Sequence, residues 1–260
     1  MLPDRLAILP LLPKHKVVVE VGVALGVFSR HILTVCQPSR FIAIDLFNLH
    51  EYQSLWGRDP KDLFGGRTHA DFYREKFAEH IRQGAMDVIE QDSAVALGTL
   101  EDASVDIIYV DADHSYESVK RELNVVKHKI KDDGLIILND YTMTEAGYSN
   151  TPYGVIQAAN EFMITENWEM AYFALEPYMY CDVALRKAGS SVPPVAAIMH
   201  NPDRYDTGLM SRINNLEARN ASLEKALQIM RASTSWQVTA PMRALRRSLA
   251  HLKIWPPRQE

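Results

Sequence analysis

The sequence predicts a doubly wound α/β fold with a Rossmann-like, mostly parallel sheet of seven strands. Short apolar runs alternate with longer segments of helical spacing up to about residue 188. Such alternation favours a parallel sheet with helices on both faces. The composition agrees, because 47% hydrophobic and 23% charged residues are ordinary values for a globular protein.

The expected elements follow one another in a regular order. The strands are KVVVEVG (16–22), FIAID (41–45), MDVIE (86–90), VDIIYVD (105–111), GLIILND (134–140), EMAYFAL (169–175) and YMYCDVALRK (178–187). Helices are expected at VFSRHIL (27–33), at SYESVKRELNVVKHKI (115–130), whose apolar residues recur at helical spacing, and at GVIQAANEFM (154–163). Ligands of such sheets bind beyond the carboxyl ends of the strands, so those ends are the candidate functional positions.

The chain divides by composition into four parts. Residues 1–188 are the expected α/β domain, and 189–207, rich in Pro, Gly and Ser, form a linker. Residues 208–231 predict a coiled coil of about three heptads, because apolar residues recur there at spacings of 3 and 4 with Asn220 in one core position. Residues 232–260 form a basic tail. We expect a homodimer through the coiled coil.

Charge and cysteine content indicate the compartment and exclude one class of partner. The net charge is −5, but residues 231–260 carry six basic residues against one acid, which leaves −10 for the rest. A body of that charge does not favour nucleic acid. Cys36 and Cys181 give no disulfide framework, and no apolar stretch approaches the ~20 residues of a membrane span. The start lacks the pattern of a signal peptide, so we expect a cytoplasmic protein.

The first strand leads into a glycine-containing turn. Glu20, Gly22 and Gly26 stand in the pattern Glu-Val-Gly-Val-Ala-Leu-Gly. Glycines at this place permit a tight turn and the close approach of a ligand to the backbone. The pattern differs from the Gly-x-Gly-x-x-Gly of dinucleotide-binding proteins. Taken alone, it fits an ordinary strand-to-helix turn equally well.

Acids also follow the second and third strands. Asp45 comes nineteen residues after Gly26, where a carboxylate can accept hydrogen bonds from both hydroxyls of a ribose, and Asp92-Ser93 can face an adenine ring. As a set, these residues resemble the motifs of class I S-adenosylmethionine-dependent methyltransferases over roughly residues 15 to 188. The resemblance implies that S-adenosylmethionine is the cofactor and that its contacts come from Glu20, Gly22, Gly26, Asp45, Asp92, Ser93 and Asp113.

The residues at the ends of the fourth and fifth strands resemble a smaller group within these methyltransferases. Val-Asp111-Ala-Asp113-His114-Ser-Tyr, followed by Leu-Asn139-Asp140-Tyr, is similar to metal-dependent O-methyltransferases, above all the sugar O-methyltransferases of macrolide and aminocoumarin pathways. The resemblance implies that Asp111, Asn139 and Asp140 bind Mg²⁺ or a similar cation. It also implies that Asp111 and His114 are catalytic, with His114 as the base that deprotonates a sugar hydroxyl.

Simpler interpretations stand beside these. Asp113 equally fits a cap of the helix that begins at Ser115, His114 fits a surface histidine, and Asn139-Asp140 fits an ordinary turn. The segment LFGGRTHADFYREKFAEHI (63–81) fits a lid over the substrate or a plain amphipathic helix. Alternative functions are a nucleotide-dependent oxidoreductase, methylation of a catechol-like or natural-product hydroxyl, and a non-catalytic scaffold in a glycan-assembly complex.

The tail resembles those of bacterial enzymes that build surface polysaccharides, through its Ser-x-Ser-Trp-x-x-Thr-Ala-Pro-x-Arg pattern at 233–243. Apolar residues at helical spacing, interleaved with arginines and bracketed by Trp236 and Trp255, are typical of a helix that lies at an anionic membrane surface. We therefore expect a glycan acceptor, including lipid-linked forms, and peripheral contact with the inner face of the cytoplasmic membrane. The alternative is that this helix packs on the acidic body.

Overall fold

The computed structural model describes residues 1–142, 153–175, 181–190 and Lys225. By contact density, Met1–Val195 form one compact unit and Ala196–Glu260 a second. The predicted coiled coil and basic tail, and all of the linker beyond Ser190, lie outside the described residues except for Lys225, which is helical and exposed. No helix within the described ranges is long and apolar enough to cross a membrane.

The described part of the chain is built around one sheet of seven strands in the order β3-β2-β1-β4-β5-β7-β6. Strands β1 to β5 pair parallel with one another, whereas β7 pairs antiparallel with both β5 and β6. This confirms the predicted mostly parallel sheet and adds an antiparallel edge. The strands are β1 (Val17–Val21), β2 (Arg40–Asp45), β3 (Met86–Glu90), β4 (Val105–Val110), β5 (Ile130–Leu138), β6 (Trp168–Ala174) and β7 (Asp182–Lys187).

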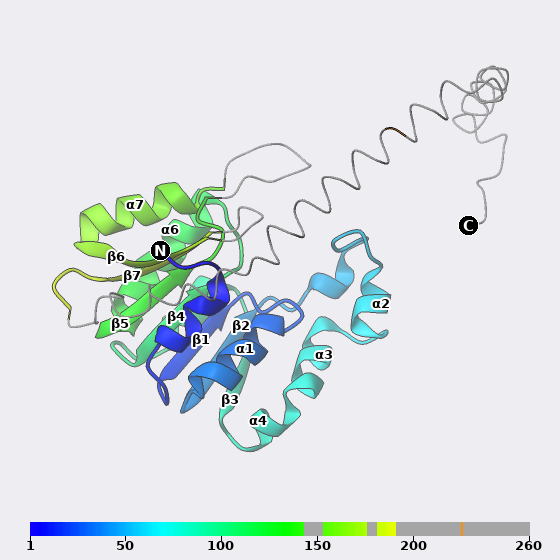
Figure 1. The fold of residues 1–260 in the computed structure, drawn as a ribbon. Coiled ribbons are helices and arrows are strands. Elements are labelled where there is room, and N and C mark those ends of the chain that lie inside the picture. Colours follow the sequence, from blue (N-terminus) through cyan, green and yellow to red (C-terminus); the bar gives the residue numbers. More distant parts are fainter. Residues whose placement is uncertain (143–152, 176–180, 191–224, 226–260) are drawn as a thin grey trace. The chain divides into compact units, whose positions relative to one another are not determined.

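Helices cover both faces of the sheet (Figure 1). One face packs against η1, η2, α1 and α3, and the other against α5, α6 and α7. Alternating side chains of each strand supply the two cores, so that Val18 belongs to the first and Val19 to the second. The helices are η1 (Arg5–Ala7), η2 (Leu9–Leu11), α1 (Val27–Cys36), η3 (Leu49–Glu51), α2 (Pro60–Phe64), α3 (His69–Lys76), α4 (Ala78–Arg82), α5 (Ser93–Gly98), α6 (Tyr116–Lys129) and α7 (Val155–Glu166).

The strand order reverses between β1 and β4. The chain moves from β1 toward β2 and β3 on one side, and from β4 toward β5 on the other. In open α/β sheets, ligands bind at the carboxyl ends of strands where the order reverses in this way. The predicted cofactor turn follows β1 and the acid–histidine segment follows β4, so both motifs meet at this point.

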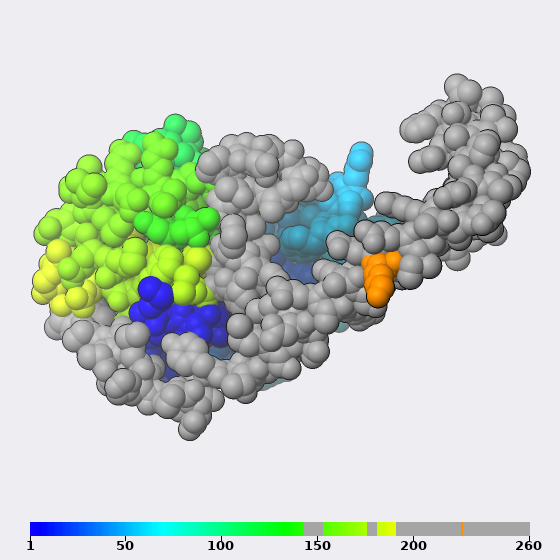
Figure 2. Space-filling view, turned by 45° about the horizontal axis from the view of Figure 1, so that its top comes forward, coloured from blue at the N-terminus to red at the C-terminus, as the bar shows by residue number. Residues whose placement is uncertain are grey.

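The N-terminal segment returns to the far edge of the sheet. Leu2 forms a parallel bridge with Ala174 of β6, and its backbone N–H donates to Phe173 O at 2.8 Å. The space-filling view shows these first residues, in dark blue, at the surface beside the late part of the domain (Figure 2). This anchoring holds η1, and with it Arg5, next to the sheet.

One boundary differs from the sequence prediction. The fifth strand, expected to begin at Gly134, begins four residues earlier as β5, at Ile130. The pairing with β4 jumps from Val105↔Ile130 to Ile107↔Leu135, so the residues between these two pairs are left out of the ladder as a bulge. The segment Asp132-Asp133-Gly134 therefore lies within a strand, where it forms part of an irregularity in the pairing, rather than before the strand.

Candidate active site

Backbone hydrogen bonds join the ends of β1, β4 and β5. The N–H of Asp111 donates to Val21 O at 2.7 Å, and the N–H of Asn139 donates to Val110 O at 3.0 Å. Each strand end is therefore fixed to its neighbour, which brings Asp111, Asn139 and Asp140 to one edge of the sheet. The sequence placed Asp111 and Asp140 at strand ends, and the resemblance to metal-dependent O-methyltransferases added Asn139.

Gly22 is required where β1 approaches the end of β4. Its φ is +79°, and a Cβ added there would lie 2.0 Å from the backbone oxygen of Asp111. The space beside this glycine is thus filled by the protein's own backbone. A structural requirement therefore accounts for Gly22, whatever contact it also makes with a cofactor.

We expect Gly22→Ala to lower the free energy of unfolding by roughly 3 kcal/mol or more, from overpacking and backbone strain together. Gly57→Ala is the matched control, because Gly57 has a φ of +74° and nothing within 4 Å of an added Cβ. That variant should lose only the strain of the left-handed backbone, about 1–2 kcal/mol. Urea unfolding of both variants measures the difference, and equal losses would contradict the close approach.

Asp45, the predicted ribose acid, holds the cofactor turn in place. Its Oδ2 accepts from the N–H of Val23 at 2.8 Å and of Ala24 at 3.4 Å, while Oδ1 accepts from the N–H of Phe47 at 2.8 Å. The carboxylate therefore lies directly beside the turn after β1. This position agrees with a role at the cofactor, and the backbone contacts add a structural role that the sequence did not indicate.

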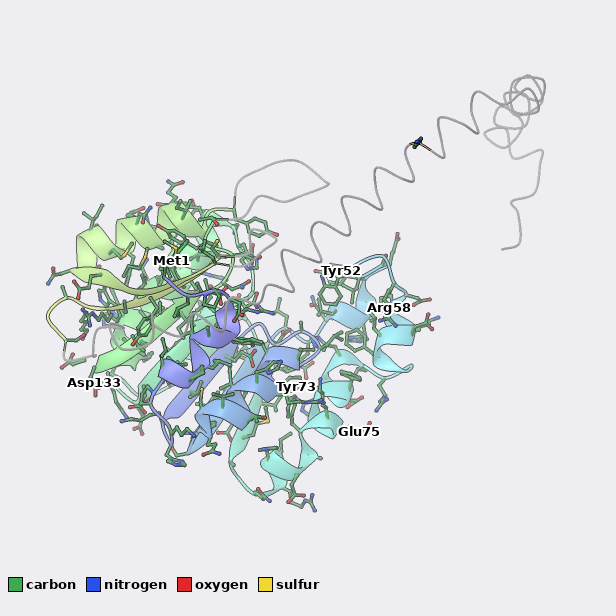
Figure 3. All side chains as sticks on the ribbon, viewed as in Figure 1. Met1, Tyr52, Arg58, Tyr73, Glu75 and Asp133 are labelled. Carbon is green, nitrogen blue, oxygen red and sulfur yellow. The ribbon has the colours of Figure 1, made fainter. Side chains whose placement is uncertain are left out.

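Helix α3 covers the same turn. His69 Nε2 lies 2.6 Å from Ala24 O, Lys76 Nζ donates to Leu25 O at 2.5 Å, and an added Cβ on Gly26 would lie 2.6 Å from the Phe77 ring. His69 and Tyr73 are fully buried, and Figure 3 shows Tyr73 on α3 beside α1. The segment for which the sequence left open a lid over substrate or a plain amphipathic helix thus packs on the predicted cofactor turn, and these two side chains are closed to solvent.

Glu20 is the most buried of the predicted cofactor residues. It is 1% exposed on β1, and its Oε2 has no hydrogen-bond partner among the described residues. Burial raises the pKa of Glu20 to about 8, although a hydrogen bond with Ser29 favours the carboxylate. At neutral pH the side chain therefore holds a proton.

The pKa of Glu20 links stability to pH. The folded protein retains the proton up to about pH 8, whereas the unfolded chain loses it near the ordinary pKa of 4.5. Its contribution to stability is thus fully present below the lower pKa and declines as pH rises through the higher one. Glu20→Gln cannot ionise, so its stability lacks this decline. We therefore expect the unfolding free energy of Glu20→Gln, minus that of the parent, to rise between about pH 5 and pH 8. The rise should be roughly 1.4 kcal/mol per unit of pKa shift. Urea unfolding across this pH range measures the trend, with exposed Glu117→Gln as the control. Parallel plots of unfolding free energy against pH for Glu20→Gln and the parent would contradict the raised pKa.

Asp92 and Ser93 are engaged at the start of α5. Asp92 caps the helix by accepting from the N–H of Val95 at 3.2 Å, and its other oxygen pairs with Arg121 at 2.9 Å. Ser93 Oγ donates to the buried carboxyl of Glu122 at 2.5 Å. Both residues lie after β3, as predicted, but their polar atoms serve the helix and its neighbour.

The contacts of Asp113 favour a role at the start of α6 over contact with the cofactor. Its oxygens accept from the N–H of Ser115 at 2.9 Å, from Ser115 Oγ at 3.1 Å and from Ser118 Oγ at 2.7 Å. Ser115, rather than Asp113, is the N-cap residue of α6. Asp113 therefore stabilises the turn that leads into the helix.

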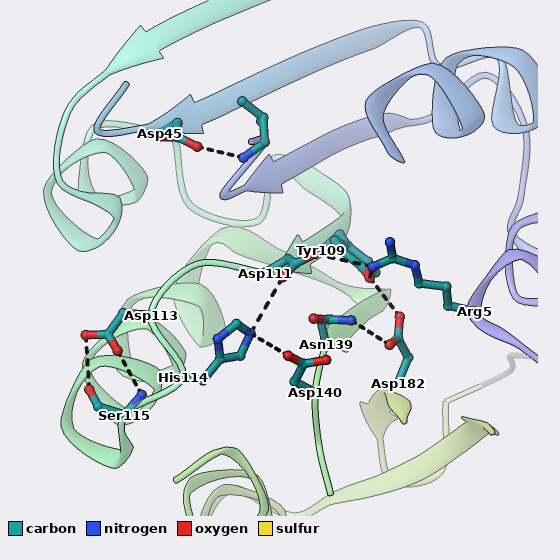
Figure 4. Close-up of polar contacts among 11 residues, drawn as sticks. Arg5, Asp45, Tyr109, Asp111, Asp113, His114, Ser115, Asn139, Asp140 and Asp182 are labelled. Carbon is teal, nitrogen blue, oxygen red and sulfur yellow. Dashed lines mark hydrogen bonds and ion pairs between the residues drawn. The ribbon is translucent and has the colours of Figure 1, made fainter. Parts of the chain in front are cut away.

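His114 lies between two acids at the carboxyl ends of β4 and β5 (Figure 4). Its Nε2 is 3.6 Å from Asp111 Oδ1 and 3.6 Å from Asp140 Oδ2, a distance for ion pairs rather than for hydrogen bonds. The imidazole stacks on Tyr153, with ring centroids 4.7 Å apart and an angle of 10° between the planes. The ring is thus held in one orientation, with Nε2 toward both carboxylates.

Electrostatics favour a proton on His114. Burial alone would lower the pKa of the imidazole, but the carboxylates of Asp111, Asp140 and Asp113 outweigh burial. The net result is a pKa above the ordinary value of 6.5. This arrangement gives a base whose strength is set by its two nearest acids.

Side chains of η1, β4 and β7 support this cluster through a second set of contacts, which the sequence did not indicate. Asp182 accepts from Asn139 Nδ2 and from the Tyr109 hydroxyl, each at 2.8 Å. Arg5 Nη1 lies 3.4 Å from both Tyr109 Oη and Asp111 Oδ2, and donates to each. Burial raises the pKa of Asp182 to about 7, although both hydrogen bonds favour its carboxylate. Asp182 therefore fixes the Asn139 amide, whose oxygen faces the Asp111 side in Figure 4.

The residues predicted to bind a metal fit a hard cation by their chemistry. Asp111, Asn139 and Asp140 offer two carboxylates and an amide oxygen, the donors that Mg²⁺ prefers. The two acids face a common point, since one oxygen of each lies 3.6 Å from His114 Nε2. Over the described ranges, no group of three or more His, Cys, Asp or Glu side chains is arranged to hold a metal. A metal role would therefore rely on Asn139 as a protein donor.

Comparisons with known proteins agree with the methyltransferase interpretation. Residues 19–141 match the family described as a methyltransferase domain. This range begins in β1 and ends just after β5, so it contains the cofactor turn, His114 and all three predicted metal ligands. No curated protein gives a significant match.

Several solved structures are similar in fold. The pyocyanin biosynthetic protein PhzM is 12% identical, with a TM-score of 0.45 over 67% of this chain and 51% of that protein, so the match spans about half of its length. A precorrin-6y C5,15-methyltransferase from Geobacter metallireducens GS-15 is 14% identical, with a TM-score of 0.46 over 70% and 86% of the two chains. An S-adenosylmethionine-dependent methyltransferase from Aquifex aeolicus is also 14% identical, with a TM-score of 0.46 over 67% and 83%.

At such low identity, these structures do not indicate which substrate this chain uses. The family match covers the strand ends at which the predicted cofactor turn and the acid–histidine cluster meet. Over residues 19–141, the chain is therefore similar to the methyltransferase-domain family.

Proposed function

We propose that this chain transfers a methyl group from S-adenosylmethionine to a hydroxyl of a sugar, in the assembly of a bacterial surface polysaccharide or glycolipid. The position of His114 between Asp111 and Asp140, beside the cofactor turn, is the observation that supports this most directly. A hydroxyl rarely loses its proton at neutral pH, so a base held in a fixed orientation next to the methyl donor suits O-methylation.

The reaction needs one proton transfer and one methyl transfer. The hydroxyl proton passes to Nε2 of neutral His114, while the hydroxyl oxygen forms a bond to the methyl carbon. The bond from that carbon to the sulfonium sulfur breaks, and its electron pair remains on sulfur. Asp111 and Asp140 stabilise the imidazolium that results, because each lies 3.6 Å from Nε2. Alignment of the three reacting atoms supplies much of the remaining acceleration.

We also propose that Asp111, Asn139 and Asp140 hold Mg²⁺ or a similar divalent cation. When bound, such an ion acts as a Lewis acid that makes a hydroxyl easier to deprotonate. The protein's part is to keep the donors in place. Asp182 orients the Asn139 amide, and Arg5 balances charge on the Asp111 oxygen that faces away from His114.

Methylation of a defined acceptor tests the substrate class. Incubation with isotope-labelled S-adenosylmethionine and a panel of sugars, sugar conjugates and catechols should label a sugar hydroxyl and add the mass of one CH₂ per site. Label on a catechol and on no sugar would favour the small-molecule alternative. Labelling of no acceptor, with adenosylhomocysteine binding intact, would favour the scaffold.

The segments beyond the described residues add a proposal that rests on sequence alone. The heptad spacing of 208–231 supports a parallel homodimer, and the basic tail, 232–260, supports peripheral membrane contact. Light scattering at micromolar concentration should give a dimer for the full chain and a monomer after removal of residues 208–260. A full chain that is monomeric at that concentration would contradict the coiled-coil proposal.

A further inference from the structure

A basic cavity of about 200 Å³ lies outside the acid–histidine cluster. It is lined by His50, Pro60, Lys61, Gly66, Arg67 and Thr68. Three of these six residues have basic side chains and none is an acid. A cavity of this size and composition favours an anionic group over a neutral one.

The cavity adjoins the predicted cofactor site. Thr68, in its wall, is the N-cap residue of α3, and the next residue, His69, contacts Ala24 O at 2.6 Å. His69 Nδ1 also lies 4.0 Å from Asp45 Oδ1. One residue thus separates the cavity wall from the turn and the acid assigned to the cofactor. A ligand in this cavity would therefore lie near the predicted cofactor turn, on the far side of His69.

Several polar groups of the cavity wall remain available to a ligand. His50 Nδ1 is buried and has no hydrogen-bond partner within the described ranges. Lys61 is exposed, and the described residues provide no ion-pair partner for its ammonium group. Arg67 uses Nη1 to pair with Glu75 and Nε to donate to Phe64 O, which leaves Nη2 for another acceptor.

Exposed aromatic rings lie on the segment between η3 and α2, two elements that line the cavity. Leu55 and Arg58 exchange two backbone hydrogen bonds of 2.9 Å, which close a turn with Trp56 and Gly57 at its tip. Trp56 has a φ of +49° and is 67% exposed, and nearby Tyr52 is 54% exposed. Figure 3 shows Tyr52 and Arg58 on this segment, between β2 and α2. A non-glycine residue in left-handed backbone that presents a bare indole points to a function for that ring.

We propose that this cavity binds the diphosphate of a nucleotide-linked sugar, with Trp56 and Tyr52 packed against its rings. The proposal rests on the proposed function and names the acceptor class for that reaction. Lys61, Arg67 and His50 supply charge-assisted hydrogen bonds to phosphate oxygens. Two exposed rings on the segment between η3 and α2, the elements that supply His50 and Lys61, suit a ligand with a base and a sugar at the two ends of its diphosphate, and this favours a nucleotide over a lipid carrier.

Isothermal titration calorimetry of the full chain, saturated with adenosylhomocysteine, tests this assignment. UDP-glucose and UDP should bind, and glucose should not. Lys61→Ala and Arg67→Ala should each raise the Kd for UDP-glucose about tenfold or more, the usual worth of a hydrogen bond to a charged group. Trp56→Ala should weaken UDP-glucose but leave the weak binding of inorganic phosphate unchanged.

Two further variants give the controls. Glu75→Gln releases Arg67 from its ion pair and should lower the Kd for UDP-glucose, a change opposite in sign to that of Arg67→Ala. Lys14→Ala removes the same charge as Lys61→Ala from an exposed position before the amino end of β1, and should leave the Kd unchanged. Equal effects of Lys61→Ala and Lys14→Ala, or glucose binding as tight as UDP-glucose binding, would overturn the proposal. Tighter binding of a prenyl-diphosphate-linked glucose in detergent micelles would overturn the choice of a nucleotide.

Failure of this proposal is distinguishable from failure of the proposed function. Methylation of a neutral sugar without any binding of UDP-glucose rejects the cavity assignment alone. Binding of UDP-glucose that depends on Lys61 and Arg67, with no methylation of any sugar, rejects the proposed reaction alone.

Discussion

His114→Ala is expected to lower kcat by roughly 10²- to 10⁴-fold, the usual contribution of a general base. The variant keeps Asp111 and Asp140 but loses the nitrogen that lies 3.6 Å from both. Single-turnover methyl transfer at saturating cofactor measures the loss. Exposed His31→Ala on α1 is the matched control and should retain the parent rate.

The pH dependence of the same two variants separates a base from a structural histidine. The pKa of His114 is raised above 6.5, so the rate of the parent should climb as pH rises through that higher pKa and the imidazole loses its proton. His114→Ala should lack this limb. The raised pKa also means that His114 contributes stability below pH 6.5 that is lost as pH rises through its folded pKa. An unchanged rate and profile in His114→Ala would assign the base to another residue.

Asp111→Asn and Asp140→Asn should each abolish turnover while the affinity for adenosylhomocysteine changes little. Both changes remove a negative charge beside His114 and a predicted ligand of the divalent cation. Asp140 has a φ of +55°, a conformation that asparagine adopts readily, so this variant should fold as the parent does. Each should also lower the pKa of His114, because the acids are what raises it.

Exposed Asp133→Asn is the control for the loss of one negative charge. Turnover and adenosylhomocysteine affinity are measured together in all three variants. If Asp111→Asn and Asp140→Asn turn over as fast as Asp133→Asn, the acids at the strand ends have no part in the chemistry. If both lose cofactor affinity and turnover in the same proportion, the acids belong to the cofactor site instead.

The sheet and the position of the site were predictable because both depend on local patterns. Runs such as Val17–Val21 and Val105–Val110 form strands because their apolar, β-branched residues must be buried on both faces. Asp111 and Asn139-Asp140 follow two such runs directly, so adjacent strands bring them together. The antiparallel edge was not predictable, since the direction of β7 depends on a connection that no residue pattern marks.

The supporting contacts were missed because they join residues that are distant in sequence. Arg5 and Asp111 are 106 positions apart, and Asn139 and Asp182 are 43 apart. An acid inside the strand expected at 178–187, Asp182, was the available signal, because a buried carboxylate needs a partner. Asp92 and Asp113 were assigned to the cofactor by resemblance, whereas local capping and turn contacts take up their oxygens.

We propose that Asp111, Asn139 and Asp140 hold a cation beside His114 for methyl transfer to a sugar hydroxyl. Removal and restoration of divalent metal tests this role. Methyl transfer by the parent protein should stop in excess chelator and return when Mg²⁺ is added beyond the chelator, while adenosylhomocysteine binding stays constant throughout. Methylation of the sugar at full rate in excess chelator would contradict the account.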